Sequence, residues 1–466
     1  MNYKPEGVCT TKITPRVHFL PLVAATLFLC AFDTATVSAG DLNQEIARLL
    51  ETHPDIKASE ESLRKANEGI RQAAGAYFPE AIITADKGHE FVDSPGRRQD
   101  PGEPSRLGRE QAKLDVTMNV FEGFKTSANF NIAELRKEVA DLALEDARQR
   151  VLLKGISAYI DVMRQQKLGA LGLQSEKNIR EQLRLENELV KRGGGIEVDV
   201  LLAKTRLQRA RERSVAFYGF LNAAIASYEE AFGNGPVFKK MKMPGLIGSE
   251  VPENLDSAME IAHEENPRIL IARKATYLAR EEIKSTRSDF YPKVDIVTNY
   301  SHKKNTDAVN GRRRDFSVVV KSTWKVFSGF ITQAKTRAAA FGASEKKKLL
   351  LSAGRRAREA VRSAWARYEA AKTRIKLLEN AVILAEEVFD ARRKLRDAGK
   401  EETINVLDAE GEIFNAQINL INAEADAQIA AYQIMAGIGR LRPGLFGVNS
   451  SKPILDDPLV PAIFLN

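Results

Sequence analysis

Histidine is the residue of this chain best suited to acid–base or metal chemistry. The five histidines are His18, His53, His89, His263 and His302. We expect His53 and His263 to flank the first turns of helices, and His89 and His302 to fall at strand ends or in loops. No two have the helical spacing of a metal site, and His89-Glu90 lacks the second histidine of a zinc protease motif. The sequence therefore predicts no enzyme, no metal site and no cofactor.

A run of glycines, Gly193-Gly194-Gly195, is the next candidate for chemistry, because glycine-rich loops bind phosphate. No Gly-Lys-Ser/Thr follows it, so a phosphate-binding loop is not indicated. The glycines instead predict a turn between two helices, since glycine commonly ends a helix. Asp199 and Asp408 each follow such a turn, where a helix N-terminus favours negative charge. Capping of the helix start is one explanation for these aspartates, and a functional role is the other.

The first 39 residues predict a secretory signal peptide. Lys4, Lys12 and Arg16 precede an apolar run over 19–32, and a small-x-small pattern ends at Ala39. The run is shorter than the roughly 17–25 residues of a membrane-spanning helix. Both cysteines lie inside this segment, so the mature chain has no thiol or disulfide chemistry.

The remaining chain is an internal duplication. Two proline pairs recur 213 residues apart: His53-Pro54 as Asn266-Pro267, and Phe78-Pro79 as Tyr291-Pro292. Val120-Phe121-x-Gly123-Phe124 recurs 206 residues later as Val326-Phe327-x-Gly329-Phe330. We predict a first repeat over 40–240, a second over 241–442, and a tail over 443–466. Each repeat should contain a helix that begins at the first proline pair, two strands and a long helical hairpin.

Four segments alternate with the period of a strand. The clearest is 111–121, with Ala112, Leu114, Val116 and Met118 on one face. Segments 293–300 and 316–326 behave likewise, and 81–87 does so more weakly. Alternation over about ten residues suits a membrane barrel strand, although an amphipathic strand of a soluble sheet has the same pattern. We expect Arg312-Arg313-Arg314 in the outward-facing loop between the third and fourth strands, where it could meet anionic lipopolysaccharide.

The helical segments are unusually long. Gly123 to Gly193 and Gly329 to Gly399 each span 70 steps, which corresponds to roughly 105 Å of continuous helix. Heptad positions such as Val361, Tyr368 and Ile375 predict coiled-coil seams. Four strands cannot close a barrel, and open sheet edges are not tolerated in lipid. Twelve strands from three chains form the smallest closed set that we expect to leave a lumen.

These motifs resemble the TolC-like outer-membrane export proteins over about Leu42 to Leu441. The resemblance rests on the duplicated order, the Val-Phe-x-Gly-Phe junctions, and the turns that lead into Asp199-Val200-Leu201 and Asn405-Val406-Leu407-Asp408. It implies a mixed α+β membrane protein: a trimeric 12-stranded outer-membrane β-barrel, four strands per chain, continued by a periplasmic α-helical coiled-coil barrel. The segment 406–416 is most similar to the branch that serves type I protein secretion, and particularly to ducts for large adhesins.

Other functions stay open at this point. A channel for small-molecule or drug efflux is the alternative within the family, and a periplasmic coiled-coil adaptor or scaffold without a pore is the more distant one. An adaptor would show a single hairpin flanked by small β-domains, whereas this chain duplicates strands and hairpins together. The secretory signal, and the lack of a stacking-aromatic pattern, argue against nucleic acid as a partner.

The resemblance also implies three sets of site residues. A periplasmic gate would use Asp199, Asn405, Asp408 and Glu401, where Asn405 stands in for an acidic residue and Glu401 for a basic one. Hairpin tips that contact an adaptor would include Gly193, Gly399, Arg192, Arg206, Lys204 and Arg396, although for any single charge a solvated side chain on a helix face is the simpler explanation. Junctions between barrel and tunnel would lie at Gly123, Gly329, Pro79 and Pro292. The implied partners are two further copies, a periplasmic adaptor, an inner-membrane transporter of ABC type, and outer-membrane lipid.

Overall fold

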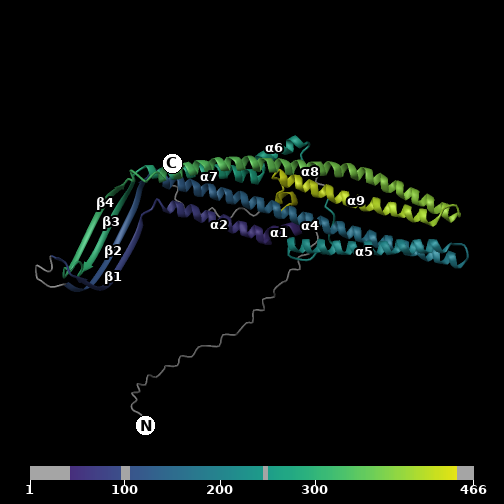
Figure 1. Ribbon diagram of the computed structural model, residues 1–466, viewed down its shortest axis with the longest axis horizontal. Helices are drawn as coiled ribbons and strands as arrows, with labels where there is room; N and C mark the ends of the chain where they lie inside the picture. Colours follow the sequence, from purple (N-terminus) through teal and green to yellow (C-terminus); the bar gives the residue numbers. More distant parts are fainter. Residues whose placement is uncertain (1–41, 96–104, 245–249, 449–466) are drawn as a thin grey trace, which may run out of the picture. The chain divides into compact units, whose positions relative to one another are not determined.

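The computed structural model describes residues 42–95, 105–244 and 250–448, and Figure 1 shows its elements. The signal segment predicted over 1–39 and the tail beyond residue 448 lie outside the described residues. In chain order the elements are α1 (Leu42–Thr52), α2 (Pro54–Gly75), β1 (Glu80–Val92), β2 (Ser105–Glu122), α4 (Lys125–Lys191), α5 (Glu197–Phe232), α6 (Leu255–Glu265), α7 (Pro267–Arg287), η1 (Ser288–Phe290), β3 (Lys293–Lys304), β4 (Arg312–Thr323), α8 (Ile331–Asp397), α9 (Thr403–Gly437) and η2 (Pro443–Phe446).

The two predicted helix starts are confirmed. His53 caps α2, with its Nδ1 accepting from the Asp55 amide at 3.2 Å, and Asn266 caps α7, with its Oδ1 accepting from the Arg268 amide at 2.9 Å. Proline follows each cap, where its fixed φ suits the first turn. His263 does not flank a first turn as predicted. It lies in the last turn of α6, a helix that the sequence pattern did not reveal.

Each repeat contains one very long helix and a shorter returning one. α4 and α8 each run for 67 residues, or about 100 Å, and pair with α5 and α9 to form two helical hairpins (Figure 1). The predicted seams hold them together. Val361, Tyr368, Leu407 and Phe414 are all buried, as are Leu207 and Tyr228 in the first repeat. None of the described helices is long and apolar enough to cross a membrane.

The four strands form one antiparallel sheet in the order β1-β2-β3-β4. β1 is a full strand of 13 residues, although its sequence pattern is weak. The prediction for Arg312-Arg313-Arg314 is wrong: all three belong to β4, paired with Lys304, Lys303 and His302. β4 also ends at Thr323, before Trp324 and Val326. A strand was hidden here because the cationic run offers no apolar alternation.

The sheet has one apolar and one polar face. Residues that face each other across antiparallel strands share a side, so the register assembles rows across the sheet. One face carries the rows Ala81/Val116/Thr298/Val318 and Ile83/Leu114/Tyr300/Phe316. The opposite face carries Thr84/Lys113/Ser301/Asp315 and Ile82/Asp115/Asn299/Ser317. The predicted facing of 111–119 is thereby confirmed.

The main hydrophobic core lies where the short helices meet the long ones. Leu49 of α1 packs with Tyr159 of α4 and Tyr228 of α5, and all three are almost fully buried. Tyr432 near the end of α9 stacks on Phe446 of η2, with 6.2 Å between ring centroids. The first residues of the tail are therefore packed against this core.

Candidate functional site

The ends of the two hairpins are built alike. Gly193 and Gly399 adopt left-handed φ values of 76° and 71° just after α4 and α8. The next amide in each case, that of Gly194 or Lys400, donates back to the carbonyl of Leu189 at 3.0 Å or of Leu395 at 2.9 Å. This backbone pattern is the glycine-terminated helix end expected from the sequence. The two turns therefore confirm the prediction of hairpin tips.

Asp199 lies in the first turn of α5 and is half-buried. Among the described residues, no side-chain hydrogen bond or ion pair joins it to a partner. Its place fits a favourable interaction with the helix dipole. Asp408 lies beyond the first turn of α9 and is paired differently.

A charged link joins the two hairpins at Asp408. The Arg206 guanidinium of α5 contacts the Asp408 carboxylate of α9, and both side chains are partly exposed. One predicted adaptor residue and one predicted gate residue are therefore partners in a single ion pair. Sequence reasoning placed them in separate sets because 202 residues separate them.

A second link lies nearer the tips and is buried. Arg396 of α8 forms an ion pair with Glu186 of α4, and the Glu186 side chain is only 2% exposed. Arg396 Nε also donates to Thr403 Oγ1 at 3.1 Å, and that hydroxyl donates to Glu186 Oε1 at 3.0 Å. This link joins α4, α8 and α9. Sequence reasoning missed Glu186 because an acidic residue within a charged helix carries no local signal.

Glu401 and Asn405, two of the four predicted gate residues, bond to each other. Asn405 Nδ2 donates to Glu401 Oε1, and the Asn405 carbonyl accepts from Arg392 at 3.2 Å. These contacts stay within the α8–α9 turn. Arg192 and Lys204, in contrast, are exposed.

A buried carboxyl group stands between the hairpins, about half a turn of α9 from Asp408. Glu410 of α9 is 8% exposed, and its oxygens meet the hydrogen-bond criteria with no described residue. Burial raises the pKa of Glu410, and the nearby Asn178 side chain of α4 offsets part of that rise. Asn178 is oriented by Gln174, whose Nε2 donates to its Oδ1 at 2.8 Å. Glu410, like Glu186, is a buried carboxylate that the sequence analysis did not identify.

The predicted junctions lie where strands join helices. Pro79 and Pro292 directly precede β1 and β3, and Gly123 and Gly329 directly precede the N-caps of α4 and α8. Gly123 has φ 58°, and a Cβ there would lie 2.6 Å from the Ser288 carbonyl oxygen. Gly329 has φ 61° but nothing within 4 Å of that position. The duplicated glycines thus share a conformation but not an environment.

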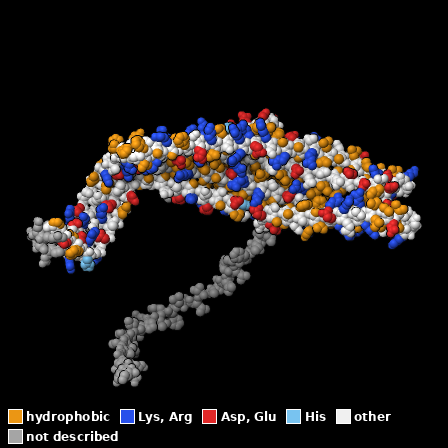
Figure 2. All heavy atoms as spheres, viewed as in Figure 1, with side chains coloured by type: hydrophobic (Ala, Val, Ile, Leu, Met, Phe, Trp, Pro, Cys, Tyr) orange, Lys and Arg blue, Asp and Glu red, His pale blue; other side chains and the backbone are white. Residues whose placement is uncertain are grey.

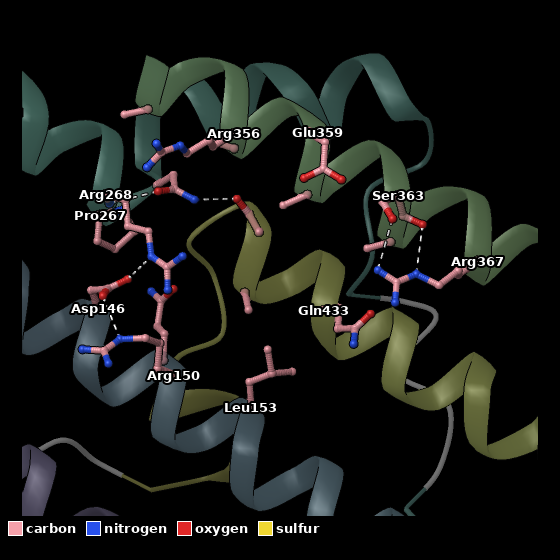
Figure 3. A pocket seen from close by; sticks show the side chains of 18 residues that line it. Asp146, Arg150, Leu153, Pro267, Arg268, Arg356, Glu359, Ser363, Arg367 and Gln433 are labelled. Atoms are coloured by element: carbon pink, nitrogen blue, oxygen red, sulfur yellow. Dashed lines mark hydrogen bonds and ion pairs between the residues drawn. The ribbon is translucent and has the colours of Figure 1, made fainter. Parts of the chain in front are cut away.

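A cavity of about 490 Å³ lies where α7 begins and α9 ends (Figure 3). The Asp146 carboxylate accepts from Arg268 Nε at 2.8 Å and from Arg150 Nε at 2.9 Å. Asn266 Nδ2 donates to the Gly437 carbonyl at 2.8 Å across the same boundary. Residues of α8, among them Arg356 and Glu359, complete the lining, so the cavity belongs to the seam where α4, α7 and α8 meet the end of α9.

Hydrophobic side chains are exposed along the helices, among charged ones (Figure 2). On α8, Leu377, Leu384, Val388 and Leu395 follow spacings of seven, four and seven residues. Such spacings place them on one stripe of the helix. The stripe does not belong to the seam with α9, which runs through Val361, Tyr368 and Ala371.

Comparison with known proteins assigns this arrangement to a class. The solved structure of the CmeC outer membrane channel of Campylobacter jejuni shares the fold, with a TM-score of 0.78 and 13% identity over 91% of this chain and 94% of that one. Duplicated helical hairpins joined to a four-stranded sheet are thus the fold that this chain shares with that channel. The family model described as outer membrane efflux protein matches residues 46–233 and 258–440, and the chain belongs to that family.

Two curated relatives cover most of the chain. The outer membrane efflux protein BepC of Brucella suis is 23% identical over 442 residues, covering 92% of each chain. The alkaline protease secretion protein AprF of Pseudomonas aeruginosa is 23% identical over 393 residues, covering 81% of this chain and 80% of its own. The predictions of a TolC-like outer-membrane channel, and of a protein that is not an enzyme, are confirmed by the family. The alternative of an adaptor or scaffold without a pore is excluded.

Proposed function

We propose that three copies of this chain form a continuous duct from the periplasm through the outer membrane, and that the duct serves type I protein secretion. The observation that carries the assembly is the sheet itself. It has an apolar face, while β1 and β4 each pair with only one other strand among the described residues. Unpaired strand edges are not stable in lipid. Twelve strands from three copies remove every edge, and the repeats over 40–240 and 241–442 supply two strands each.

The hairpin ends form the gate in this proposal. Asp199, Asp408, Asn405 and Glu401 narrow the periplasmic mouth, and the Arg206–Asp408 and Arg396–Glu186 links hold the hairpins together in the closed state. Opening separates the α8–α9 hairpin from the α4–α5 hairpin, so both links must break. The exposed pair contributes little, about 0–1 kcal/mol, and the buried one resists separation more strongly.

The partners follow from the same tips. Arg192 and Lys204, together with the turns at Gly193 and Gly399, are exposed and available to a periplasmic adaptor. Arg206 and Arg396 contact the adaptor only after they release Asp408 and Glu186. Adaptor docking is therefore coupled to opening, with an ABC-type exporter of the inner membrane supplying the cargo and outer-membrane lipid surrounding the sheet.

Support for type I secretion comes from the segment 406–416 and from the similarity to a protein named for protease secretion. Small-molecule efflux is the second candidate, because BepC is named an efflux protein at equal identity. The deciding experiment is quantitative mass spectrometry of surface and medium proteins from a deletion strain and its complemented parent. Loss of one large secreted protein, restored by complementation, supports secretion. An unchanged set of secreted proteins, with new sensitivity to toxic small molecules, supports efflux.

The gate is tested by single-channel conductance in planar bilayers. Asp408→Ala removes the partner of Arg206, so we expect a higher conductance or a larger open fraction than in the wild type. Glu412→Ala is the matched control, because Glu412 lies on the same helix and is exposed. Equal conductance of the Asp408 variant and the wild type would argue against a gating role for this aspartate.

A further inference from the structure

The end of the sheet farthest from the helices carries an unusual set of charges. In the β3–β4 pair, two consecutive cross-strand pairs are cationic, Lys303/Arg313 and Lys304/Arg312, and His302 faces Arg314 in the next pair. Like charges directly opposite each other destabilise a sheet. Their presence calls for a compensating anion, either in the protein or outside it.

Some of these cations are neutralised within the chain. Arg313 Nε lies 2.8 Å from an oxygen of Asp315, and Lys304 lies 3.4 Å from Glu110, which also binds Lys87 at 2.8 Å. Arg312 and Arg314 are exposed, and neither forms an ion pair with another described residue. In the row Lys87/Glu110/Lys304/Arg312, the carboxylate of Glu110 is therefore the one negative charge that offsets three cations.

The register places Arg312 and Arg314 on the apolar face. Their row partners Lys304 and His302 continue the sequence of rows that includes Thr298/Val318 and then Tyr300/Phe316. An aromatic row at the end of an apolar band is typical of the membrane interface. Arg314 lies about 7 Å and Arg312 about 14 Å beyond Phe316 along the strand, at about 3.4 Å per residue.

Arg314 lies at the depth of the headgroups, and Arg312 lies beyond it. The polar regions of a bilayer add roughly 10–15 Å in total to its hydrocarbon core, or about 5–7 Å per leaflet. Arg314, about 7 Å beyond the aromatic row, therefore lies at the lipid phosphates. The long Arg312 side chain, about 14 Å along a strand that tilts by about 45° in a membrane barrel, extends back to them. β1 ends, β2 begins and β3 turns into β4 at this end, whereas β2 leads into α4 and β3 follows α7 at the other. With the helices in the periplasm, this end faces the outer leaflet.

We propose that Arg312 and Arg314, with Lys304 and His302 beside them, bind the phosphate groups of lipid A in the outer-leaflet lipopolysaccharide. Guanidinium groups suit this ligand because they form paired hydrogen bonds with phosphate oxygens. The proposal rests on the outer-membrane duct described above and gives it a lipid partner of stated chemistry. The sequence analysis expected these arginines to meet lipopolysaccharide from a loop. In the structure they lie on a strand, which holds them at a fixed depth.

The test is native mass spectrometry of the detergent-solubilised full chain, titrated with bisphosphorylated lipid A in the presence of a chelator. Arg312→Gln plus Arg314→Gln should weaken binding by about tenfold or more, as loss of two charge-assisted contacts predicts. Arg355→Gln plus Arg358→Gln on α8 removes the same charge from exposed positions elsewhere and should leave binding unchanged. If the double variant is unstable, Arg314→Gln alone should still weaken binding measurably.

Three results would overturn the proposal: equal lipid A affinity of the β4 variant and the wild type, equal binding of dephosphorylated lipid A, or displacement of lipid A by millimolar inorganic phosphate. The last result would identify a site for free phosphate rather than lipid. Channel formation in bilayers without lipopolysaccharide is measured in parallel. A chain that forms channels but does not bind lipid A refutes this inference alone, whereas a chain that forms no channel refutes the proposed function.

Discussion

The two long helices are equal in length but not in burial. α4 and α8 each have 67 residues, yet α4 buries 19 of them and α8 only six. α4 packs against α2, α5, α7 and α9, whereas α8 packs mainly against α7 and α9. The exposed side of α8 carries Leu377, Leu384, Val388 and Leu395. Duplication supplied the same helix twice, and one copy lies inside the protomer while the other lies at its edge.

The junction glycines show the same difference. Gly123, before α4, is enclosed by Ser288 and Tyr291, and Gly329, before α8, has open space around it. In the proposed trimer the edge that contains β4, Gly329 and α8 meets the next protomer. The predictions below test that assignment, in order of decreasing expected effect.

The largest effect is expected at the exposed stripe of α8. Leu377→Glu plus Leu384→Glu places charges where the next copy should pack, and each leucine contributes about 1.5–3 kcal/mol when fully buried. We expect loss of the trimer, measured by light scattering after size-exclusion chromatography. Lys376→Glu plus Ile383→Glu is the control, because each position precedes a stripe residue and faces about 100° round the helix. A stable trimer in the stripe variant would show that this stripe of α8 is not part of the interface between protomers.

The buried link at the tip should have the next largest effect. Arg396→Ala leaves the Glu186 carboxylate buried without its ion partner, which typically costs about 3–5 kcal/mol. Arg206→Ala breaks an exposed pair and should cost less than about 1 kcal/mol. Chemical denaturation of the two variants gives both values. Equal effects would mean that the two links do not differ in burial in the assembled protein.

The two junction glycines can be compared directly, and the expected effect on stability is smaller. Ala at either position is strained by the left-handed backbone, at roughly 1–2 kcal/mol. Gly123→Ala additionally clashes with the Ser288 carbonyl, so it should be less stable than Gly329→Ala by about 1–3 kcal/mol. Thermal unfolding followed by circular dichroism measures this difference. If the next protomer packs closely on Gly329, the two variants will be similar in the trimer and differ only in the monomer.

The smallest effect concerns pH. Because burial raises the pKa of Glu410, the stability that this group contributes is fully present below the unfolded-state pKa and is lost as pH rises through the folded-state pKa. Glu410→Gln should therefore match the wild type at about pH 4 and become the more stable of the two at neutral pH. Glu412→Gln, at an exposed position, should show no such trend. If Glu410→Gln and the wild type differ in stability by the same amount at about pH 4 and at neutral pH, the raised pKa of Glu410 is refuted.

Much of the fold could be predicted because its signals are local and repeated. Pro54 and Pro267 marked helix starts, Gly193 and Gly399 marked turns, and heptads marked the seams. The cationic start of β4 was misplaced because pairing with β3, rather than side-chain alternation, makes it a strand. α1 and α6 were missed because short helices give weak periodicity.

The site divides in the same way. The sequence named Asp408, Arg206 and Arg396 by their place near the turns, but not their partners. Glu186 and Glu410 could not be found, since a carboxylate in a charged helix reveals its burial only when another helix packs over it.

The sequence by itself determined the duplicated order, the helix lengths and the two faces of the sheet, because each follows from the chemistry of residues close together in the chain. Only the tertiary structure decided which of the two duplicated long helices is buried, which charges pair across the hairpins, and which arginines lie on the apolar face of the sheet. Those outcomes depend on contacts between residues that lie far apart in the chain, as between Arg206 and Asp408, and local pattern does not encode them.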